Sequence, residues 1–341
     1  MALAAGAVHE AAAEAARGVT EPKTALRAAA IAGVGLAVPD RVVGSAEVAE
    51  RIGVSEDWIV ARTGVRERRI AEPDERLSEL AAEAGRRALE RAGATPTDVD
   101  LVLVATIAAD ELMPNAAPLV AYELGAERAG ALDVGAACTG FVSALALASG
   151  QVECGRAECA LVIGADLCSR LIDGADRGTA AIFADGAGAA VVGPARNGGR
   201  LGPVVLGADG AAAAAVRTDH VERVIRMQGH DTFREAVRRL SEATLLALDR
   251  AGARVEEVDL FVYHQANARI LAAVAERLGL ERERVIDCID RYGNTSAATV
   301  PIALAEADAA GLLAPGAKVL LAAFGAGFTW GAGLMTWEGA A

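Results

Sequence analysis

The sequence predicts an α/β fold built from two copies of one unit. The stretch "ALERAGATPTDVDL" at 88–101 matches "ALDRAGARVEEVDL" at 247–260 at nine of fourteen positions, with an offset of 159 residues. A second pair follows in the same order, "YELGAE" at 122–127 and "ERLGLE" at 276–281. Similar segments that recur in order along a chain indicate an internal duplication.

Each copy is expected to pass from an amphipathic helix into a buried strand. The repeated stretch turns at Gly93 or Gly252 and enters an apolar segment, "LVLVA" at 101–105 or "LFVYH" at 260–264. Alternating helices and strands predict mostly parallel sheets with right-handed crossovers. Ligand sites in such sheets lie beyond the carboxyl ends of the strands, so functional groups are expected there.

Length and composition fit this division. The 341 residues are 53% apolar, which is enough for a large core and two domain-sized units. We expect an Ala-rich tail over 1–28, an N-terminal half over 29–200 and a C-terminal half over 201–341. The tail carries charged residues and no continuous apolar segment, so it does not resemble a secretory signal. The net charge of −13 argues against a nucleic-acid surface.

Two uncharged stretches, 134–152 and 319–337, are long enough to cross a membrane. Both are interrupted by Gly, Ser and Thr, so we interpret them as buried strands and a buried helix, with no membrane partner. The five cysteines form no CxxC pair, and their number is odd. This pattern favours reduced thiols in the cytoplasm over a disulfide framework or a metal site.

The repeat also predicts a functional site around Cys138, which lies in "ALDVGAACTGF" at 131–141. Transferred to the second copy, this position falls near Asn294 in "RYGNTSAA". His264 ends the strand that pairs by repetition with 101–105, so it points into the same region. We therefore expect a thiol, a carboxamide and an imidazole to converge.

Each group alone has an ordinary structural interpretation. Cys138 could be a packing cysteine, His264 a core imidazole, and Asn294 a helix N-cap. Their convergence favours catalysis instead, with the Cys138 thiolate stabilised by the dipole of the helix that follows. The glycine-rich "FGAGFTWGAG" at 324–333 could be a simple turn, or its N–H groups could stabilise an oxyanion.

Three arginines near the expected mouth, Arg62, Arg177 and Arg269, suit a phosphate-bearing ligand, and Trp58 offers a surface for an adenine base. Together they favour a ligand such as coenzyme A. The stretch "GVGLAVP" at 33–39 lacks the spacing of a dinucleotide-binding fingerprint.

From 31 to 338 the chain resembles the 3-oxoacyl-(acyl-carrier-protein) synthase III family of thiolase-fold condensing enzymes. The resemblance rests on six blocks in order: "DWIVARTGVRERRIA", "GAACTGF", "DRGTAAIFADGAGAAVV", "HQANARI", "DRYGNTSAATVP" and "FGAGFTWGAG". It implies two βαβαβ halves in an α-β-α-β-α sandwich and a homodimer. It also implies acyl transfer from acyl-CoA to a cysteine and condensation with malonyl-acyl carrier protein, without a metal or redox cofactor.

The resemblance also implies roles for individual residues. Cys138 is the acyl acceptor, His264 and Asn294 are its partners, and the backbone N–H groups of Cys138 and Ala326 form the oxyanion hole. The positions that match coenzyme A contacts are Trp58, Arg62, Thr63, Arg177, Gly178, Phe233, Ala266 and Asn267. Met113 and Phe328 match the acyl pocket, and Arg269 matches a docking position for the carrier protein.

Three features depart from the family pattern: Met113 replaces a usual Phe, His230 replaces a usual Asn, and the loop at 208–220 is short and Ala-rich. Starter units for polyketide or secondary lipid synthesis are therefore as compatible as those for fatty acids. One alternative is an acyltransferase on the same scaffold that acylates a hydroxyl or amine. A non-catalytic partner subunit is disfavoured by Cys138, and a papain-like hydrolase by the duplicated pattern.

Overall fold

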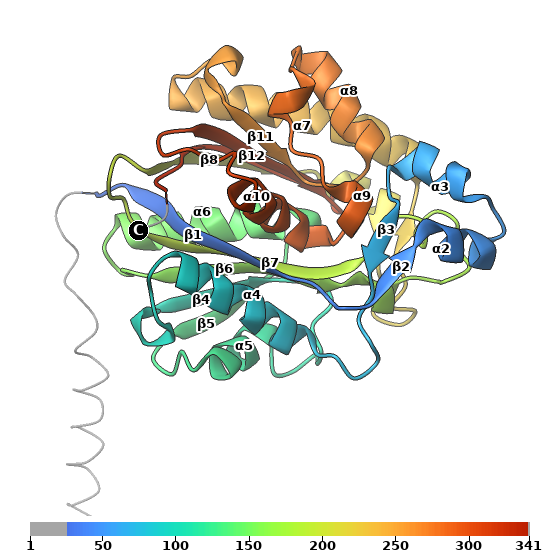
Figure 1. Cartoon of the computed structure of the whole chain (residues 1–341), viewed down its shortest axis with the longest axis horizontal. Helices are drawn as coiled ribbons and strands as arrows, with labels where there is room; N and C mark the ends of the chain where they lie inside the picture. Colours follow the sequence, from blue (N-terminus) through green and yellow to red (C-terminus); the bar gives the residue numbers. More distant parts are fainter. Residues whose placement is uncertain (1–25, 340–341) are drawn as a thin grey trace, which may run out of the picture.

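The computed structural model describes residues 26–339 (Figure 1), so most of the expected tail over 1–28 lies outside the described residues. The strands are β1 (Ala29–Ala37), β2 (Val42–Gly44), β3 (Glu67–Arg69), β4 (Leu101–Ala105), β5 (Gly130–Val134), β6 (Ala160–Leu167), β7 (Asp185–Pro194), β8 (Arg200–Ala208), β9 (Val216–Arg217), β10 (Arg226–Met227), β11 (Leu260–Tyr263), β12 (Lys318–Gly325) and β13 (Thr329–Thr336). The helices are α2 (Ser45–Ile52), α3 (Glu56–Thr63), α4 (Leu77–Arg91), α5 (Ala116–Leu124), α6 (Gly140–Glu153), α7 (Gly229–Ala251), α8 (Ala268–Leu278), α9 (Ile289–Tyr292) and α10 (Thr299–Ala309).

The two large sheets repeat one strand order. The first sheet runs β1-β7-β6-β4-β5, and the second runs β8-β13-β12-β11 when read from its other edge. The place of β5 in the second sheet is taken by Val285, which forms an isolated parallel bridge with Phe261 of β11. The predicted duplication is therefore visible in the topology.

The expectation of mostly parallel sheets is wrong. β4 is parallel to β5 and β6, and β11 is parallel to β12, but β7 and β13 are antiparallel to both of their neighbours. For β12 and β13 the reason is a short connection, because they are joined by only residues 326–328. A parallel crossover needs a dozen residues or more.

The elements form the five layers that the family resemblance implies (Figure 1). Helices α4 and α5 cover the first sheet, α7 and α8 cover the second, and α6 and α10 lie between the two sheets. Most residues of α10 are buried, as expected for a helix that packs on both sides. α4 is instead amphipathic and buries one face.

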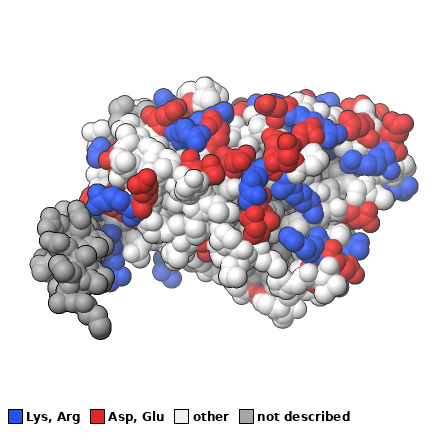
Figure 2. All heavy atoms as spheres, turned by 90° about the horizontal axis from the view of Figure 1, so that it is seen from below, with Lys and Arg blue, Asp and Glu red and all other residues white. Residues whose placement is uncertain are grey.

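The two uncharged stretches, 134–152 and 319–337, become sheet strands and the central helix α6, as interpreted from the sequence. None of the described helices combines the length and the apolar character needed to cross a membrane. On the face seen in Figure 2, acidic and basic side chains lie close to one another around a broad uncharged area.

Candidate active site

The candidate site lies where one loop from each half meets the other. A short 3-10 helix at Ala137–Thr139 precedes α6, and a second at Ser296–Ala298 precedes α10. Each begins with a non-glycine residue at positive φ, Ala137 at 45° and Ser296 at 53°. Ala137 and Ser296 are 159 residues apart, as are the two 3-10 helices that they begin. The repeat seen in the sequence therefore extends to the backbone of the site.

This offset corrects one step of the sequence analysis. The structural counterpart of Cys138 is Ala297, and Asn294 lies three residues earlier in the same loop. The expectation that Cys138 maps near Asn294 is therefore wrong by three residues, because the spacing of 159 residues persists as far as Ala137 and Ser296. The conclusion that the two loops face one another still holds, since Ser296 Oγ lies 3.6 Å from Cys138 Sγ.

Glycines in the sheets allow this close approach. A Cβ on Gly164 of β6 would lie 2.3 Å from the carbonyl oxygen of Ala297. A Cβ on Gly325 of β12 would lie 3.0 Å from the backbone nitrogen of Cys138. Each loop therefore packs directly on the sheet of the other half, which places the two loops at a fixed separation.

Cys138 is a thiol held mainly in its protonated form. Burial raises its pKa to about 11, the hydrogen bond from Ser296 opposes this rise, and the buried carboxylate of Asp166 adds to it. Loss of hydration therefore opposes the thiolate that is expected at this helix start. Attack by this sulfur requires a group that accepts its proton.

His264 is a neutral imidazole at the end of β11. It is 2% exposed, and burial lowers its pKa to about 3. Its Nδ1 lies 2.5 Å from Thr299 Oγ1, and Nε2 has no hydrogen-bond partner among residues 26–339. Because the imidazole lines the same cavity as Cys138, Nε2 is the nitrogen available to a bound molecule.

The next side chain, Gln265, has a structural role. Its amide nitrogen donates to the carbonyls of Tyr263 and Ile286, and its amide oxygen accepts from the Cys288 N–H. Gln265, one of the polar residues that follow His264, therefore stabilises the backbone around the site and does not face a ligand.

Asn294 has a fixed orientation. Its side-chain oxygen accepts the Ser296 N–H at 2.9 Å, so its amide nitrogen is left to donate into the cavity. Its backbone N–H donates to Ile182 O, and its carbonyl accepts from Ala184 N–H. Asn294 is not the N-cap of the helix that follows, since Thr295 holds that position, but the bond from Ser296 N–H still orients its amide.

Asp166 is a site residue that the sequence analysis missed. This fully buried carboxylate accepts hydrogen bonds from Thr106 Oγ1, Ile107 N–H and Ala297 N–H at 2.8–3.1 Å. Burial raises its pKa to about 6. It joins the loop after β4 to the Ser296 loop, and no sequence pattern marks it, since it reads as the end of an apolar strand.

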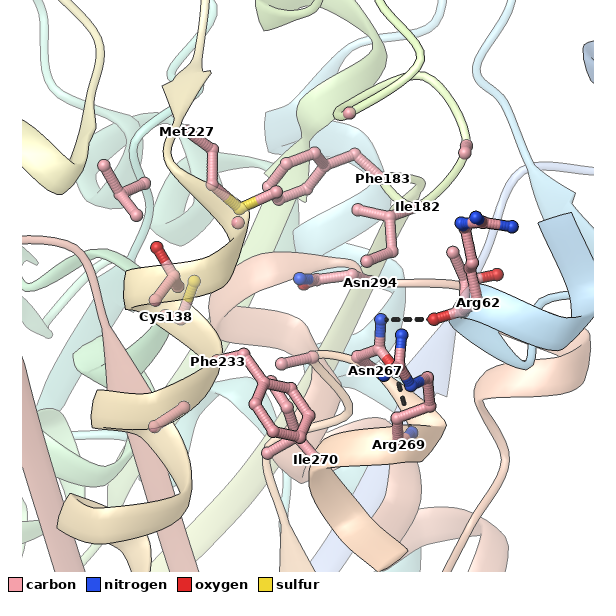
Figure 3. Close-up of a pocket in the computed structure, with 18 of the residues that line it drawn as sticks. Arg62, Cys138, Ile182, Phe183, Met227, Phe233, Asn267, Arg269, Ile270 and Asn294 are labelled. Carbon is pink, nitrogen blue, oxygen red and sulfur yellow. Dashed lines mark hydrogen bonds between the residues drawn. The ribbon is translucent and has the colours of Figure 1, made fainter. Parts of the chain in front are cut away.

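Most predicted residues line one cavity of about 460 Å³ (Figure 3). The predicted residues found there are Trp58, Arg62, Thr63, Cys138, Arg177, Gly178, Phe233, His264, Ala266, Asn267, Arg269, Asn294 and Ala326. His230, noted for its departure from the family pattern, lines it too. Cys138 lies on one side in Figure 3, and Arg62, Asn267 and Arg269 lie on the opposite side.

Local contacts order the arginine side of this cavity. The Arg62 guanidinium lies 4.3 Å from the centre of the Trp58 ring. Asn267 donates to the Arg62 carbonyl at 2.9 Å and accepts from the Arg269 N–H at 2.8 Å. Asn267 therefore caps α8 and ties it to α3, which are separate elements in the sequence.

Met113 and Phe328 do not line this cavity. Met113 is 85% exposed on the loop before α5, and Phe328 is buried with its ring centre 4.8 Å from that of Phe324. A second cavity of about 280 Å³ also reaches Cys138. Its apolar lining includes Ile107 and Leu112, and Arg217, Asp219, His220 and Arg223 also contribute to its wall.

No group of three or more His, Cys, Asp or Glu side chains within residues 26–339 could hold a metal ion. All five cysteines are free thiols.

Comparison with known proteins agrees with the earlier resemblance. Residues 132–210 match the family model described as 3-oxoacyl-[acyl-carrier-protein] synthase III, and 248–337 match the model of its C-terminal part. The beta-ketoacyl-[acyl-carrier-protein] synthase III 3 of Streptomyces coelicolor is 44% identical over 327 residues, covering 91% of this chain and 98% of the relative.

Solved structures are similar over the same extent. The synthase III of Thermus thermophilus superposes with a TM-score of 0.88 at 44% identity, covering 91% of this chain and all of that one. The priming beta-ketosynthase of the R1128 polyketide biosynthetic pathway superposes with a TM-score of 0.89 at 38% identity, covering 95% of this chain and all of that one.

Proposed function

The chain belongs to the 3-oxoacyl-[acyl-carrier-protein] synthase III family, and from this premise we propose the reaction that it catalyses. It transfers an acyl group from acyl-CoA to Cys138 and condenses it with malonyl-acyl carrier protein, releasing CO₂ and a 3-oxoacyl thioester. The observation that carries the proposal is the meeting of Cys138, His264 and Asn294 in one cavity.

In the first half-reaction, Cys138 Sγ attacks the thioester carbon of acyl-CoA. The N–H groups of Cys138 and Ala326 hold the oxyanion, an interaction worth a few kcal/mol per donor. The thiol proton leaves Sγ during the attack, and His264 stays neutral because burial lowers its pKa to about 3. The C–S bond to coenzyme A then breaks, and that sulfur takes the proton.

In the second half-reaction, malonyl thioester loses CO₂, and the electron pair forms an enolate. The amide nitrogen of Asn294 and the Nε2–H of His264 donate to the enolate oxygen. The enolate carbon attacks the Cys138 thioester, and Sγ leaves and regains a proton from water. No step draws on a metal or a redox cofactor.

The arginine side of the cavity binds coenzyme A in this proposal. Trp58 and Arg62 offer a stacked aromatic and cationic surface, and Arg177 and Arg269 add positive charge for phosphates. Thr63, Gly178, Phe233, Ala266 and Asn267 complete the contacts. Arg269, at the start of α8, also receives the carrier protein.

We also propose a homodimer formed through the edge of the first sheet. β5 is an edge strand, and Leu132 on it is 58% exposed, near Tyr122 of α5 at 81%. An apolar, unpaired strand edge favours pairing with a second copy. Exposed Met113 would then reach the acyl group of the partner protomer. Sedimentation of wild type and Leu132→Arg tests this, with dimer and monomer expected respectively.

The acyl group occupies the second cavity beside Cys138. Its lining does not select between a fatty-acid and a polyketide starter unit, so either pathway is compatible.

The reaction takes place in the cytoplasm, a proposal supported by five free thiols.

Release of CO₂ tests the proposal against the alternative of acyl transfer to a hydroxyl or amine. The purified protein is acylated with acyl-CoA, freed of coenzyme A, and mixed with malonyl-acyl carrier protein labelled in its free carboxyl group. Condensation predicts one CO₂ and one 3-oxoacyl product per acyl-enzyme. Acylation without CO₂ favours the acyltransferase, and no acylation favours a non-catalytic subunit.

A further inference from the structure

A third cavity, of about 230 Å³, is lined by arginines of the N-terminal half. Its wall comes from α2, from β2 and β3, and from the segment 169–183. Arg41, Arg51 and Arg68 line it, and Glu47 is the acidic side chain that accompanies them. Among the described residues, the lining therefore carries three guanidinium groups and one carboxylate, which is a net charge of +2 at neutral pH.

The Arg68 guanidinium in β3 is buried and only partly hydrogen-bonded. Its side chain is 1% exposed. Nη2 donates to Ser45 Oγ at 3.2 Å and to the Ala181 carbonyl at 3.1 Å. Within residues 26–339, Nε and Nη1 have no hydrogen-bond partner. Burying a charged group without partners is costly, so an acceptor that reaches these two donors would be stabilising.

The charges around Arg68 are not balanced. Burial lowers the pKa of Arg68 to about 10, the charge of Arg51 lowers it further, and the carboxylate of Glu47 raises it. Arg68 is thus still protonated at neutral pH. Glu47 and Glu72 both lie near Arg41, at 3.7 and 3.9 Å. In the described part of the chain, Arg51 has no hydrogen-bond or ion-pair partner, so two cations face the cavity with little compensation.

We propose that this cavity is an anion site for a phosphate-class oxyanion, held by the guanidinium groups of Arg51 and Arg68, with Arg41 at its mouth. Guanidinium N–H groups bind phosphate oxygens in a two-pronged geometry. The cavity is smaller than the roughly 300–1,000 Å³ of sites for larger organic ligands, so it suits an inorganic ion or one phosphate group. The proposal does not depend on the condensation reaction.

The oxyanion has two possible sources, because this cavity adjoins the one proposed for coenzyme A. Phe183 lines both cavities. Arg177, a proposed contact of coenzyme A, donates to the carbonyls of Ile52 and Gly53, which directly follow Arg51. The site therefore takes either free phosphate or a phosphate group of coenzyme A bound next to it.

Calorimetric titration with inorganic phosphate, at constant ionic strength, tests the site and separates these sources. The titration is done with wild type alone and with wild type saturated with coenzyme A. Phosphate that still binds in the presence of coenzyme A identifies free phosphate as the ligand. If coenzyme A prevents phosphate binding and Arg51→Gln weakens the binding of both, the ligand is a phosphate group of coenzyme A.

Two variants of α2 should change the affinity in opposite directions. Arg51→Gln removes a guanidinium group and should raise the Kd for phosphate by about 10- to 100-fold, the loss of one hydrogen bond to a charged group. Glu47→Gln removes the opposing carboxylate and should lower that Kd by about two- to fivefold. A variant that merely disturbed the fold would not bind phosphate more tightly than wild type.

Arg250→Gln and Glu256→Gln are the matched controls. They make the same changes of charge at exposed positions outside the cavity, and should leave the Kd within about twofold of wild type because distant charges are screened. Circular dichroism checks that each variant folds. No phosphate binding by wild type, or equal effects of Arg51→Gln and Arg250→Gln, would overturn the site. Failure to release CO₂ while phosphate still binds would contradict the proposed function alone.

Discussion

The loops before α6 and α10 are copies of one backbone that perform different chemistry. Each has a positive-φ residue at its start, and each packs on a glycine in the sheet of the other half. The first loop carries Cys138, the nucleophile of the proposed reaction, where the second carries Ala297. The second loop instead carries Asn294 and Ser296, which orient donors toward that sulfur.

This difference teaches how duplication builds an active site. Two identical loops would place like groups against one another across the interface between the halves. Divergence of a few side chains converts that arrangement into a nucleophile faced by a carboxamide and an imidazole, while the shared backbone keeps their spacing. The edges of the sheets diverge as well, because β5 is a full strand and its counterpart is a single bridge at Val285.

The largest expected effect comes from removing the fixed donor of the second loop. Asn294→Ala should lower CO₂ release from malonyl thioester by about 100- to 1,000-fold, the loss typical of one preorganised donor. Acylation of Cys138 should continue, because the first loop and the oxyanion N–H groups remain. Separate assays of the two half-reactions measure this, and loss of acylation alone would contradict the division of roles.

The next effect comes from forcing the loops apart. A methyl group at Gly164 would collide with the Ala297 carbonyl, so Gly164→Ala should lower the free energy of unfolding by about 1–3 kcal/mol and slow both half-reactions. Gly150→Ala is the control, since a Cβ there meets nothing within 4 Å. Urea unfolding measures the free energy of unfolding of both variants. Equal values would contradict close packing of Gly164 against the Ala297 carbonyl.

The neutrality of His264 predicts a pH dependence of stability. Burial lowers the folded-state pKa from 6.5 to about 3, so the unfolded chain binds the proton first as the pH falls. This contribution is fully present above pH 6.5 and is lost progressively toward pH 3. Between pH 7 and 5 wild type should lose about 2 kcal/mol more unfolding free energy than His264→Gln. Denaturant titrations at both pH values measure this difference. Equal losses of unfolding free energy in wild type and His264→Gln would show that His264 can be charged in the folded protein.

The smallest effect comes from the hydroxyl of Ser296. Its hydrogen bond to Cys138 Sγ opposes the rise in the thiol pKa, so Ser296→Ala should raise that pKa further. Alkylation of Cys138 by iodoacetamide at pH 8 should slow by roughly tenfold, for about one unit of pKa. Ser149→Ala, whose hydroxyl donates to Ala146 O within α6, is the matched control. An unchanged alkylation rate would show that the Ser296 hydroxyl does not influence the pKa of the Cys138 thiol.

Two kinds of feature could be predicted from the sequence: the internal duplication, and the functional residues that follow the ends of strands. The matched stretches predicted the duplication and the meeting of Cys138 with His264 and Asn294 in one cavity. Trp58 and Arg177 were expected near the mouth from their residue types, whereas Asn267 was assigned to the cavity by the family resemblance alone.

Other features had no signal in the sequence. The role of Asp166 depends on a contact between the halves, which neither periodicity nor spacing encodes. The rise in the pKa of Cys138 comes mainly from burial, which depends on the three-dimensional environment. The antiparallel pairing of β12 with β13 follows from a short connection that apolar patterning does not reveal.

The position of the acyl group after exposure to acyl-CoA tests the central claim most directly. The protein is incubated with acyl-CoA, digested and examined by mass spectrometry, with Cys138→Ala alongside. The account predicts one acyl group per chain on the peptide that contains Cys138, and none in the variant. An adduct on Cys154, the other partly exposed cysteine, or an adduct that persists in the variant, would contradict it.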